Sequence, residues 1–277
     1  MNNSNILISI ATFKESENII NLINKIRETY PITKILIIND FSDDNTKELI
    51  KKTNDQNLIY LERPKKLGLG TAHKLSIFYS IKYNFDYLIT LDADFSHDPI
   101  YIPNLLKAAG TNNFVIGSRF CKGARSDYRG FRKIISICGN FFAKKFLKIQ
   151  LNEITTYFRV YSVELLKKLP FDELNAQGYS LGVKLVWLMK KLNADLIEIP
   201  IHFKDRNKGK SKIPKLQILI SFFDLFLIKL KEIFSKQKFY KINKTYNFET
   251  KCDRCNECFL TLKNKKYKCL VCNKILL

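Results

Sequence analysis

Apolar runs alternate with helical periodicities along residues 5–203. The runs are short and rich in Ile, Leu and Val, as is typical of buried strands, and apolar residues spaced three or four positions apart between them predict helices. The predicted strands are residues 5–12, 34–40, 57–63, 86–94, 113–120 and 196–203. The predicted helices are residues 19–26, 45–52 (capped by Asn45 or Thr46) and 70–84. This alternation predicts an α/β fold with a mostly parallel, Rossmann-like sheet and helices on both faces.

Two carboxylates close the predicted strand 86–94. Asp92 and Asp94 are separated only by Ala93, and like charges this close repel unless a cation lies between them. In open α/β sheets ligands bind beyond the carboxyl ends of the strands, where Asp40 also falls. Mg²⁺ and Mn²⁺ prefer carboxylates and phosphate oxygens, so we predict that Asp92 and Asp94 hold such a metal together with a diphosphate. A lone D-x-D also occurs by chance on loops.

A different pattern occupies Leu216–Leu230. Its few polar positions fall on a narrow helical stripe, and the rest is Leu, Ile and Phe. Fifteen residues of helix span about 22 Å, which is short of the roughly 30 Å hydrocarbon core of a bilayer. With Lys210, Lys212, Lys215 and Lys229 beside it, the segment is interpreted as an amphipathic helix at an anionic membrane surface. The alternative is a helix buried against the domain.

Composition adds a strong positive charge. The 277 residues are 46% hydrophobic, enough for a sizeable core with an appendage, and the net charge is +21. Residues 204–277 hold 19 Lys and Arg against 6 Asp and Glu. Such a tail favours lipid headgroups, nucleic acid or a phosphorylated substrate as partner, although a Lys- and Asn-rich composition can also come from an AT-rich genome. The opening residues have no signal-peptide pattern, so we expect a peripheral protein on the cytoplasmic face of a membrane.

Five of the seven cysteines lie close together near the end of the chain. They are Cys252, Cys255, Cys258, Cys269 and Cys272. Paired C-x-x-C turns around a short basic, hairpin-like stretch resemble a zinc ribbon, in which four thiolates bind a structural Zn²⁺. Cys269, Cys272 and Cys255 belong to either choice of four, and one of the other two is spare. Reduced surface thiols are the alternative. No specific nucleic acid is expected as a partner, because nothing else in the sequence supports one.

Eight motifs occur in order along residues 5–215. They are ISIATFKESENI, ILIINDFSDDNT, RPKKLGLGTAHK, LDADFSHDP, VIGSRFCKGA, ITTYFRVYS, NAQGYSLGVKL and IPIHFKDRNKGKSKI. Together they resemble the polyprenol-phosphate (dolichol-phosphate) mannosyltransferases, which are inverting glycosyltransferases of the GT-A fold. The resemblance implies transfer of a hexose, mannose first, from a nucleotide diphosphate sugar such as GDP-mannose to polyprenyl phosphate.

The resemblance also implies roles for individual residues. Donor binding falls to Ala11, Thr12, Glu15, Asp40, Gly68, Gly70 and Ala93. Catalytic roles fall to Asp92, Asp94, Arg119, Arg206 and Lys212, and Arg119 and Arg132 would bind the acceptor phosphate, which suits the planar guanidinium. The alternatives are local ones: Thr12, Asp40 and the glycines could serve turns, and Arg119 could form a structural ion pair.

No general base is nominated. A polyprenyl monophosphate is already anionic near neutral pH and can attack the anomeric carbon once it is positioned. His97, in SHDP, is interpreted as the entry to a helix or turn.

Four positions depart from the family pattern. Asn39 stands where an acid is frequent, Glu153 replaces Asp, Tyr157 replaces Gly, and Lys184 stands where Glu is expected. They leave open another hexose, a different phosphorylated lipid, a glycan hydroxyl as acceptor, or a degenerate scaffold that only binds the donor. The predicted division of the chain is a GT-A domain over 1–214, the membrane-interface helix and a linker over 215–245, and the zinc-ribbon-like module over 246–277.

Overall fold

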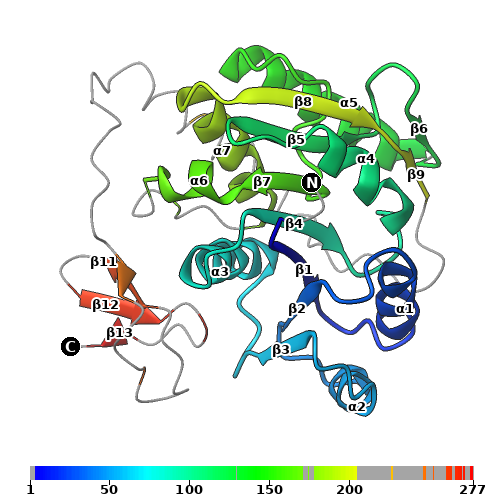
Figure 1. Cartoon of the computed structure of the whole chain (residues 1–277). Coiled ribbons are helices and arrows are strands. Elements are labelled where there is room, and N and C mark those ends of the chain that lie inside the picture. Colours follow the sequence, from blue (N-terminus) through cyan, green and yellow to red (C-terminus); the bar gives the residue numbers. More distant parts are fainter. Residues whose placement is uncertain are drawn as a thin grey trace.

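In the computed structural model, a seven-stranded sheet with helices on both faces forms the body of the protein (Figure 1). The structure describes residues 4–128, 130–170, 174 and 178–204, then Phe226 and the short segments 246–247, 252, 260–263, 266–269, 271 and 275–276. The strands are β1 (Ile6–Thr12), β2 (Lys34–Asn39), β3 (Leu58–Glu62), β4 (Tyr87–Asp92), β5 (Asn113–Ser118), β6 (Arg125–Ser126), β7 (Arg159–Ser162), β8 (Asp195–Pro200) and β9 (His202–Phe203). The helices are α1 (Ile19–Thr29), α2 (Thr46–Lys52), α3 (Leu69–Lys82), the 3₁₀ turn η1 (Pro99–Tyr101), α4 (Ile102–Lys107), α5 (Gly130–Leu147), α6 (Val163–Lys167) and α7 (Gly178–Lys191).

The strand order places the predicted chemistry at one edge. The order is β3-β2-β1-β4-β7-β5-β8, and every pairing is parallel except those of β7 with β4 and β5. Thr12 pairs with Asn39 across β1 and β2, and Ala11 pairs with Asp92 across β1 and β4. The carboxyl ends of β1, β2 and β4 therefore open onto the same edge, as the sequence predicts.

Each strand contributes to two apolar layers because successive side chains point to opposite faces. On β1, Leu7 joins the layer that contains α3 and α7, whereas Ile8 and Ile10 join the layer of α1 and α4. All three side chains are fully buried. Burial on both faces explains why these strands are continuous apolar runs in the sequence instead of alternating ones.

The predicted strands and helices of residues 5–203 are confirmed, with two corrections. The predicted strand 196–203 is divided into β8, at the edge of the main sheet, and β9, which pairs with β6 in a separate two-stranded sheet. The other correction concerns a helix cap. Neither Asn45 nor Thr46 caps α2 with its side chain. The Asp44 carboxylate accepts from Thr46 N (3.2 Å) and Thr46 Oγ1 (2.6 Å) instead. Several elements were not predicted. The strands β6 and β7 and the helices α4 and α6 are each at most six residues long, and the longer helices α5 and α7 carry apolar residues on more than one face, which hides the helical period.

The tail contains a small antiparallel sheet. Its strands are β10 (Tyr246–Asn247), β11 (Leu260–Lys263), β12 (Lys266–Cys269) and β13 (Ile275–Leu276), paired in that order. The pairing of β11 with β12 confirms the hairpin-like stretch between the cysteine pairs. Cys252 and Cys269 are buried, and Cys255, Cys258 and Cys272 lie outside the described residues.

The predicted membrane-interface helix falls outside the described residues, apart from Phe226, which is helical and exposed. Within the part of the chain that the structure describes, no helix combines the length and apolar character needed to cross a bilayer. The domain boundaries at 214 and 245 remain a prediction.

Candidate active site

The Asp92–Asp94 turn leaves β4 at the open edge of the sheet. Phe95 adopts a left-handed conformation (φ 62°), and Asp94 Oδ1 accepts from Ser96 N (3.1 Å) and Ser96 Oγ (2.6 Å). The Asp94 residue is nearly buried, while the Asp92 side chain retains 32% of its exposure. The turn thus holds one carboxylate firmly and leaves the other accessible to a ligand at the edge.

His97 ties this turn to the segment before β7. Its Nδ1 accepts from the backbone N–H of Asp92 (3.0 Å), and its Nε2 lies 2.7 Å from Thr156 Oγ1. Complete burial lowers the pKa of His97 to about 4, the neighbouring Asp94 only partly opposing this. The ring is therefore neutral, and because Nδ1 accepts, Nε2 carries the proton and donates to Thr156. Next to it, the Asp98 carboxylate accepts from Ile100 N (3.1 Å) and starts η1, which confirms the turn-entry interpretation of SHDP.

Asp40 organises the loop after β3. Its Oδ1 accepts from Leu67 N (2.8 Å) and Arg63 (2.9 Å), and its Oδ2 accepts from Gly68 N (2.7 Å). Arg63 is fully buried, so its ion pair with Asp40 lies in a low-dielectric environment. The charge-assisted hydrogen bond is strong there and holds the loop after β3 in place. Asp40 thus shapes the backbone that faces the edge; its contact with a base or ribose stays a prediction.

Of the two glycines near this loop, Gly68 and Gly70, only Gly68 has a backbone conformation that favours glycine. Gly68 has φ +89°, which a residue with a side chain rarely adopts, and it precedes the first residue of α3. Gly70 is buried within the first turn of α3. Only Gly68 is required by its backbone conformation.

The loops after β1 and β2 are tied together. Lys14 N donates to Ser42 Oγ (2.8 Å), and Ser16 N donates to Asp44 Oδ2 (3.1 Å). Thr12, at the end of β1, is buried and its Oγ1 has no hydrogen-bond partner among the described residues. Glu15 accepts from Asn18 Nδ2 (2.9 Å) at the entry to α1.

Asn39, which stands where the family pattern frequently has an acid, is held by its neighbours Tyr60 and Ser42. Its Nδ2 donates to the Tyr60 hydroxyl (2.8 Å), and its Oδ1 accepts from Ser42 N (3.2 Å). A tyrosine hydroxyl accepts from an amide and equally donates to a carboxylate, so this contact accommodates either residue. Burial raises the pKa of Tyr60 to about 12, so the phenol stays protonated.

Arg119 lies just beyond β5 and is paired with Glu153. Its Nε and a terminal nitrogen lie 2.6 and 3.0 Å from the two oxygens of Glu153, and the same terminal nitrogen donates to Thr155 Oγ1 (3.0 Å). Burial acts to raise the pKa of Glu153, but Arg119 and the Thr155 hydrogen bonds hold it below its usual value. The structure therefore contains the ion pair that the sequence left as the alternative for Arg119, and any phosphate contact must share this guanidinium.

Buried basic side chains surround Tyr157 and Lys184, the two remaining positions that depart from the family pattern. Arg159 is fully buried and donates to the carbonyls of Thr156 (2.6 Å), Ile154 (2.8 Å) and Gly182 (2.9 Å). Tyr157 stacks on His73 with ring centroids 3.8 Å apart.

Gly182 leaves space for the Tyr157 ring because it has no side chain. A Cβ at this position would come within 3.2 Å of Tyr157 Cζ. Tyr157 and Gly182 are thus accommodated together, and Lys184, two residues further along α7, is also buried.

The donor set at the edge fits a hard divalent cation. Asp92 and Asp94 offer carboxylate oxygens on one turn, as Mg²⁺ and Mn²⁺ require. The half-exposed Asp92 faces the edge at which a diphosphate could supply the remaining oxygens. In the described residues, no cluster of three or more His, Cys, Asp and Glu suggests a metal site made by protein alone.

The edge brings together Ala11, Thr12, Asp40, Gly68, Asp92, Ala93 and Asp94, since β1, β2 and β4 are neighbours. Arg119 enters from β5, across β7. The Arg132 side chain, Arg206 and Lys212 lie outside what the structure describes. No local signal in the sequence marks three further residues near this edge, because their partners are distant along the chain. They are Arg63, His73 and Thr156.

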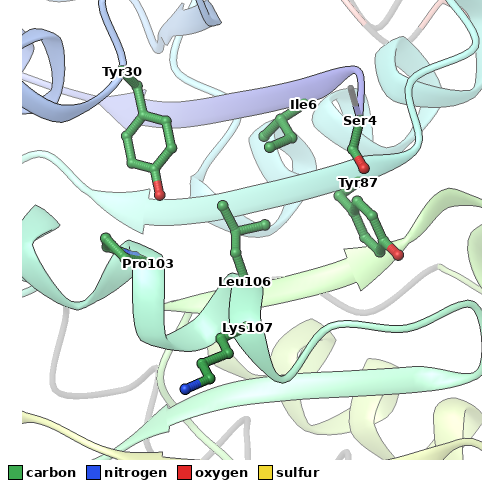
Figure 2. A pocket seen from close by; sticks show the side chains of 7 residues that line it. All are labelled: Ser4, Ile6, Tyr30, Tyr87, Pro103, Leu106 and Lys107. Atoms are coloured by element: carbon green, nitrogen blue, oxygen red, sulfur yellow. The ribbon is translucent and has the colours of Figure 1, made fainter. Parts of the chain in front are cut away.

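A groove of about 540 Å³ lies at the opposite end of the sheet (Figure 2). It lies at the amino ends of β1 and β4, between the end of α1 and helix α4. Its lining residues are Ser4, Ile6, Tyr30, Tyr87, Pro103, Leu106 and Lys107. The length of β4 separates it from Asp92, so it is not part of the carboxylate edge.

Residues 7–170 match the sequence profile of glycosyl transferase family 2. The chain belongs to this family. A similar protein, the undecaprenyl-phosphate mannosyltransferase of Micrococcus luteus, is 30% identical over 211 residues, which are 75% of this chain and 87% of that protein. The polyprenol monophosphomannose synthase of Mycolicibacterium smegmatis is 27% identical over 212 residues, 75% of this chain and 80% of that one.

Solved structures agree on the fold. Glucosyl-3-phosphoglycerate synthase from Mycobacterium tuberculosis, in complex with Mn²⁺, UDP and glucosyl-3-phosphoglycerate, superposes with a TM-score of 0.55 at 17% identity, covering 83% of this chain and 80% of that chain. The same enzyme with Mn²⁺, UDP and phosphoglyceric acid gives 0.57 at 16% identity, covering 94% and 87%. The GT-A fold predicted from the sequence is confirmed, and as a family 2 member the chain is a nucleotide-sugar-dependent glycosyltransferase.

Proposed function

We propose that this glycosyltransferase moves mannose from GDP-mannose to a polyprenyl phosphate at the cytoplasmic face of a membrane. The observation that carries the proposal is the carboxylate turn at the end of β4, beside β1 and β2, in a chain that resembles two polyprenyl-phosphate mannosyltransferases over three quarters of its length.

The donor occupies the edge formed by β1, β2 and β4. Ala11, Thr12 and Glu15 line the nucleotide pocket, and the buried, unpartnered Thr12 Oγ1 supports a polar contact there. Asp40 holds the loop of residues 63–68 in place, and the backbone of this loop, together with Gly70, lies close to the donor. Ala93 leaves room between the carboxylates. This assignment is supported by the register that places these residues side by side.

Asp92 and Asp94 hold Mg²⁺ or Mn²⁺ against the donor diphosphate. The metal, when bound, offsets the negative charge that develops on the leaving nucleoside diphosphate. The contribution of the chain is positional: Ser96 fixes Asp94, and His97 fixes the peptide of Asp92.

Four basic side chains bind the anionic groups of the donor and the acceptor: Arg119, Arg132, Arg206 and Lys212. Of these, Arg119 and Arg132 bind the acceptor phosphate. A phosphate oxygen attacks the anomeric carbon from the face opposite the leaving group and inverts it, and no protein base has to remove a proton. The neutral, doubly engaged His97 supports this, because neither ring nitrogen is available as a base. Arg119 remains partly neutralised by Glu153, which orients its guanidinium.

Two further parts of the chain complete the proposal. The Leu216–Leu230 segment binds the membrane surface, and the tail binds one structural Zn²⁺ through four of its five cysteines. Burial of Cys252 and Cys269 beside a basic hairpin supports a closed thiolate site.

Transfer to lipid is tested directly. The purified chain is incubated with labelled GDP-mannose, Mn²⁺ and polyprenyl phosphate in vesicles, and label is counted in the organic extract. Parallel arms contain UDP-glucose as donor and a free glycan as acceptor. We expect lipid-linked mannose that disappears in Asp94→Ala. Label found only on the glycan would instead assign a hydroxyl acceptor. Donor binding without any transfer would indicate a scaffold.

A further inference from the structure

The outer face of α5 carries a continuous apolar surface. Ile134, Ile137, Phe141, Phe142 and Phe146 are each between 42% and 58% exposed. They are half of the large apolar side chains found exposed in the described residues. Single exposed apolar residues are ordinary on a protein surface, but a contiguous group on one helix marks an interaction site.

Helical geometry separates this surface from the core-facing side of the same helix. At 100° per residue, Ile134, Ile137 and Phe141 form one stripe, with Phe142 and Phe146 beside it. Ala143 and Leu147 lie on the opposite side and are fully buried in the core. The helix is therefore apolar on two sides, and packing within the described fold accounts for only one of them.

The charged residues in and around α5 are all basic, which favours an anionic partner for its outer face. Between Asp127 and Glu153 the sequence has no acidic residue. It contains Arg129, Arg132, Lys133, Lys144, Lys145 and Lys148. Lys133, Lys145 and Lys148 are exposed. Lys145 Nζ lies 5.6 Å from the Phe141 ring centroid, which places a cationic group directly beside the apolar face. An apolar face within a purely basic segment is complementary to an anionic bilayer surface.

The inner side of α5 holds the segment that carries part of the candidate site. Asn140 Oδ1 accepts from Ile154 N (2.7 Å), and Lys144 Nζ donates to Asn152 Oδ1 (2.8 Å). That segment supplies Glu153 to Arg119 and Thr156 to His97. A membrane contact on the outer face would therefore lie one helix away from Arg119, one of the two residues assigned to the acceptor phosphate.

We propose that the outer face of α5, formed by Ile134, Ile137, Phe141, Phe142 and Phe146 within its lysine surround, is the surface on which the catalytic domain rests on an anionic bilayer. The occupant is the lipid headgroup and upper acyl region. Where the acceptor is concerned, the inference rests on the proposed function; the membrane contact itself does not.

The test uses the full chain and vesicles of phosphatidylglycerol or phosphatidylcholine. The variant Ile137→Ser with Phe141→Ser removes the centre of the face, and Ile32→Ser with Ile100→Ser is the matched control, because both of those residues are exposed elsewhere. We expect at least tenfold weaker sedimentation with phosphatidylglycerol for the first variant, no change for the second, and weaker binding of the wild type at high salt. Equal binding of all three proteins would overturn the proposal.

A depth measurement locates the contact. Phe142→Trp places an indole on the face, while the native Trp187 is buried and serves as a constant background. We expect quenching of the new indole by lipids brominated in the upper acyl chain. Absence of quenching while the protein is bound, or a change of oligomeric state in the serine variant without a change in vesicle binding, would assign the face to a protein contact and overturn the proposal.

Activity measurements with two acceptors distinguish a failure of the membrane contact from a failure of the proposed function. In the α5 serine variant, transfer to long polyprenyl phosphate in vesicles should fall, while transfer to a short, water-soluble prenyl phosphate stays unchanged. If the wild type transfers to neither acceptor, the proposed function fails while the vesicle and quenching results still decide the membrane contact.

Discussion

His97 bridges the Asp92 peptide and the Thr156 hydroxyl. Its Nδ1 accepts from Asp92 N at 3.0 Å and its Nε2 lies 2.7 Å from Thr156 Oγ1. The bridge connects the carboxylate turn after β4 with the segment that enters β7, 59 residues later in the chain. A neutral ring in one tautomer thus holds the Asp92 peptide against the segment that enters β7.

His97→Leu should lower kcat by about 10²-fold, because displacement of a positioning group by about 1 Å can cost that much. His97→Asn retains an acceptor for the Asp92 N–H and should recover part of the loss. Steady-state kinetics with the lipid acceptor, at fixed Mn²⁺, give kcat and KM for each. Equal loss in both variants, with matched unfolding curves, would show that the hydrogen bond to Asp92 is not what matters.

Asp94→Ala should reduce transfer by at least about 10²-fold, since a metal offsets several kcal/mol of developing charge on the leaving group. Asp92→Ala should also be severe. A chelator should abolish the activity of the wild type, and added Mn²⁺ or Mg²⁺ should restore it. Unchanged turnover in both variants with metal present would contradict the metal role.

Glu153→Gln should lower the free energy of unfolding by about 3–5 kcal/mol, because it leaves the Arg119 charge buried without its partner. Urea unfolding measures the loss. Arg119→Met combined with Glu153→Leu should restore most of the stability, since a well-packed apolar pair often replaces a buried ion pair at little cost.

The same double variant reports on the role of Arg119. If the residue also binds the acceptor phosphate, transfer should stay low although the fold has recovered. Recovery of transfer together with stability would reduce Arg119 to a structural role.

His73 should make the fold sensitive to mild acid. Burial, with Arg159, His97 and Arg63 nearby, holds its pKa well below the usual 6.5. Below pH 6.5 the unfolded chain takes up a proton that the folded chain does not, so stability is complete above that pH and declines as the pH falls. The slope is at most about 1.4 kcal/mol per pH unit for each such histidine, and His97 acts in the same direction down to about pH 4.

His73→Phe should remove one of these two contributions while retaining the stacking on Tyr157. Denaturant unfolding between pH 5 and pH 8 should show a shallower dependence for the variant than for the wild type. Parallel curves for the two proteins would mean that the ring is already charged in the fold.

The tail should bind one zinc per chain, because four thiolates complete a tetrahedral site and their binding free energy folds a module without a core of its own. Metal analysis and thiol titration check this. A chain ending near Lys241 should still bind the nucleotide sugar. Seven reactive thiols and no zinc in the native protein would exclude the ribbon.

The sequence by itself determined the α/β fold and the edge that carries the carboxylates. Continuous apolar runs such as residues 34–40 are buried on both faces, and this local property is readable without a structure. Once the sheet is mainly parallel, Asp40 and Asp92 must leave it on the same side. The family motifs added the kind of reaction.

Only the tertiary structure decided which polar groups meet. Arg119 pairs with Glu153 and Arg63 with Asp40 across 34 and 23 residues. The sequence does not specify such partners, because the strength of each contact depends on how completely the packed chain excludes water around it. The same holds for α5, where the apolar residues are visible in the sequence but the inner and outer sides become distinct only when Ala143 and Leu147 are packed against the core and Phe141 is not.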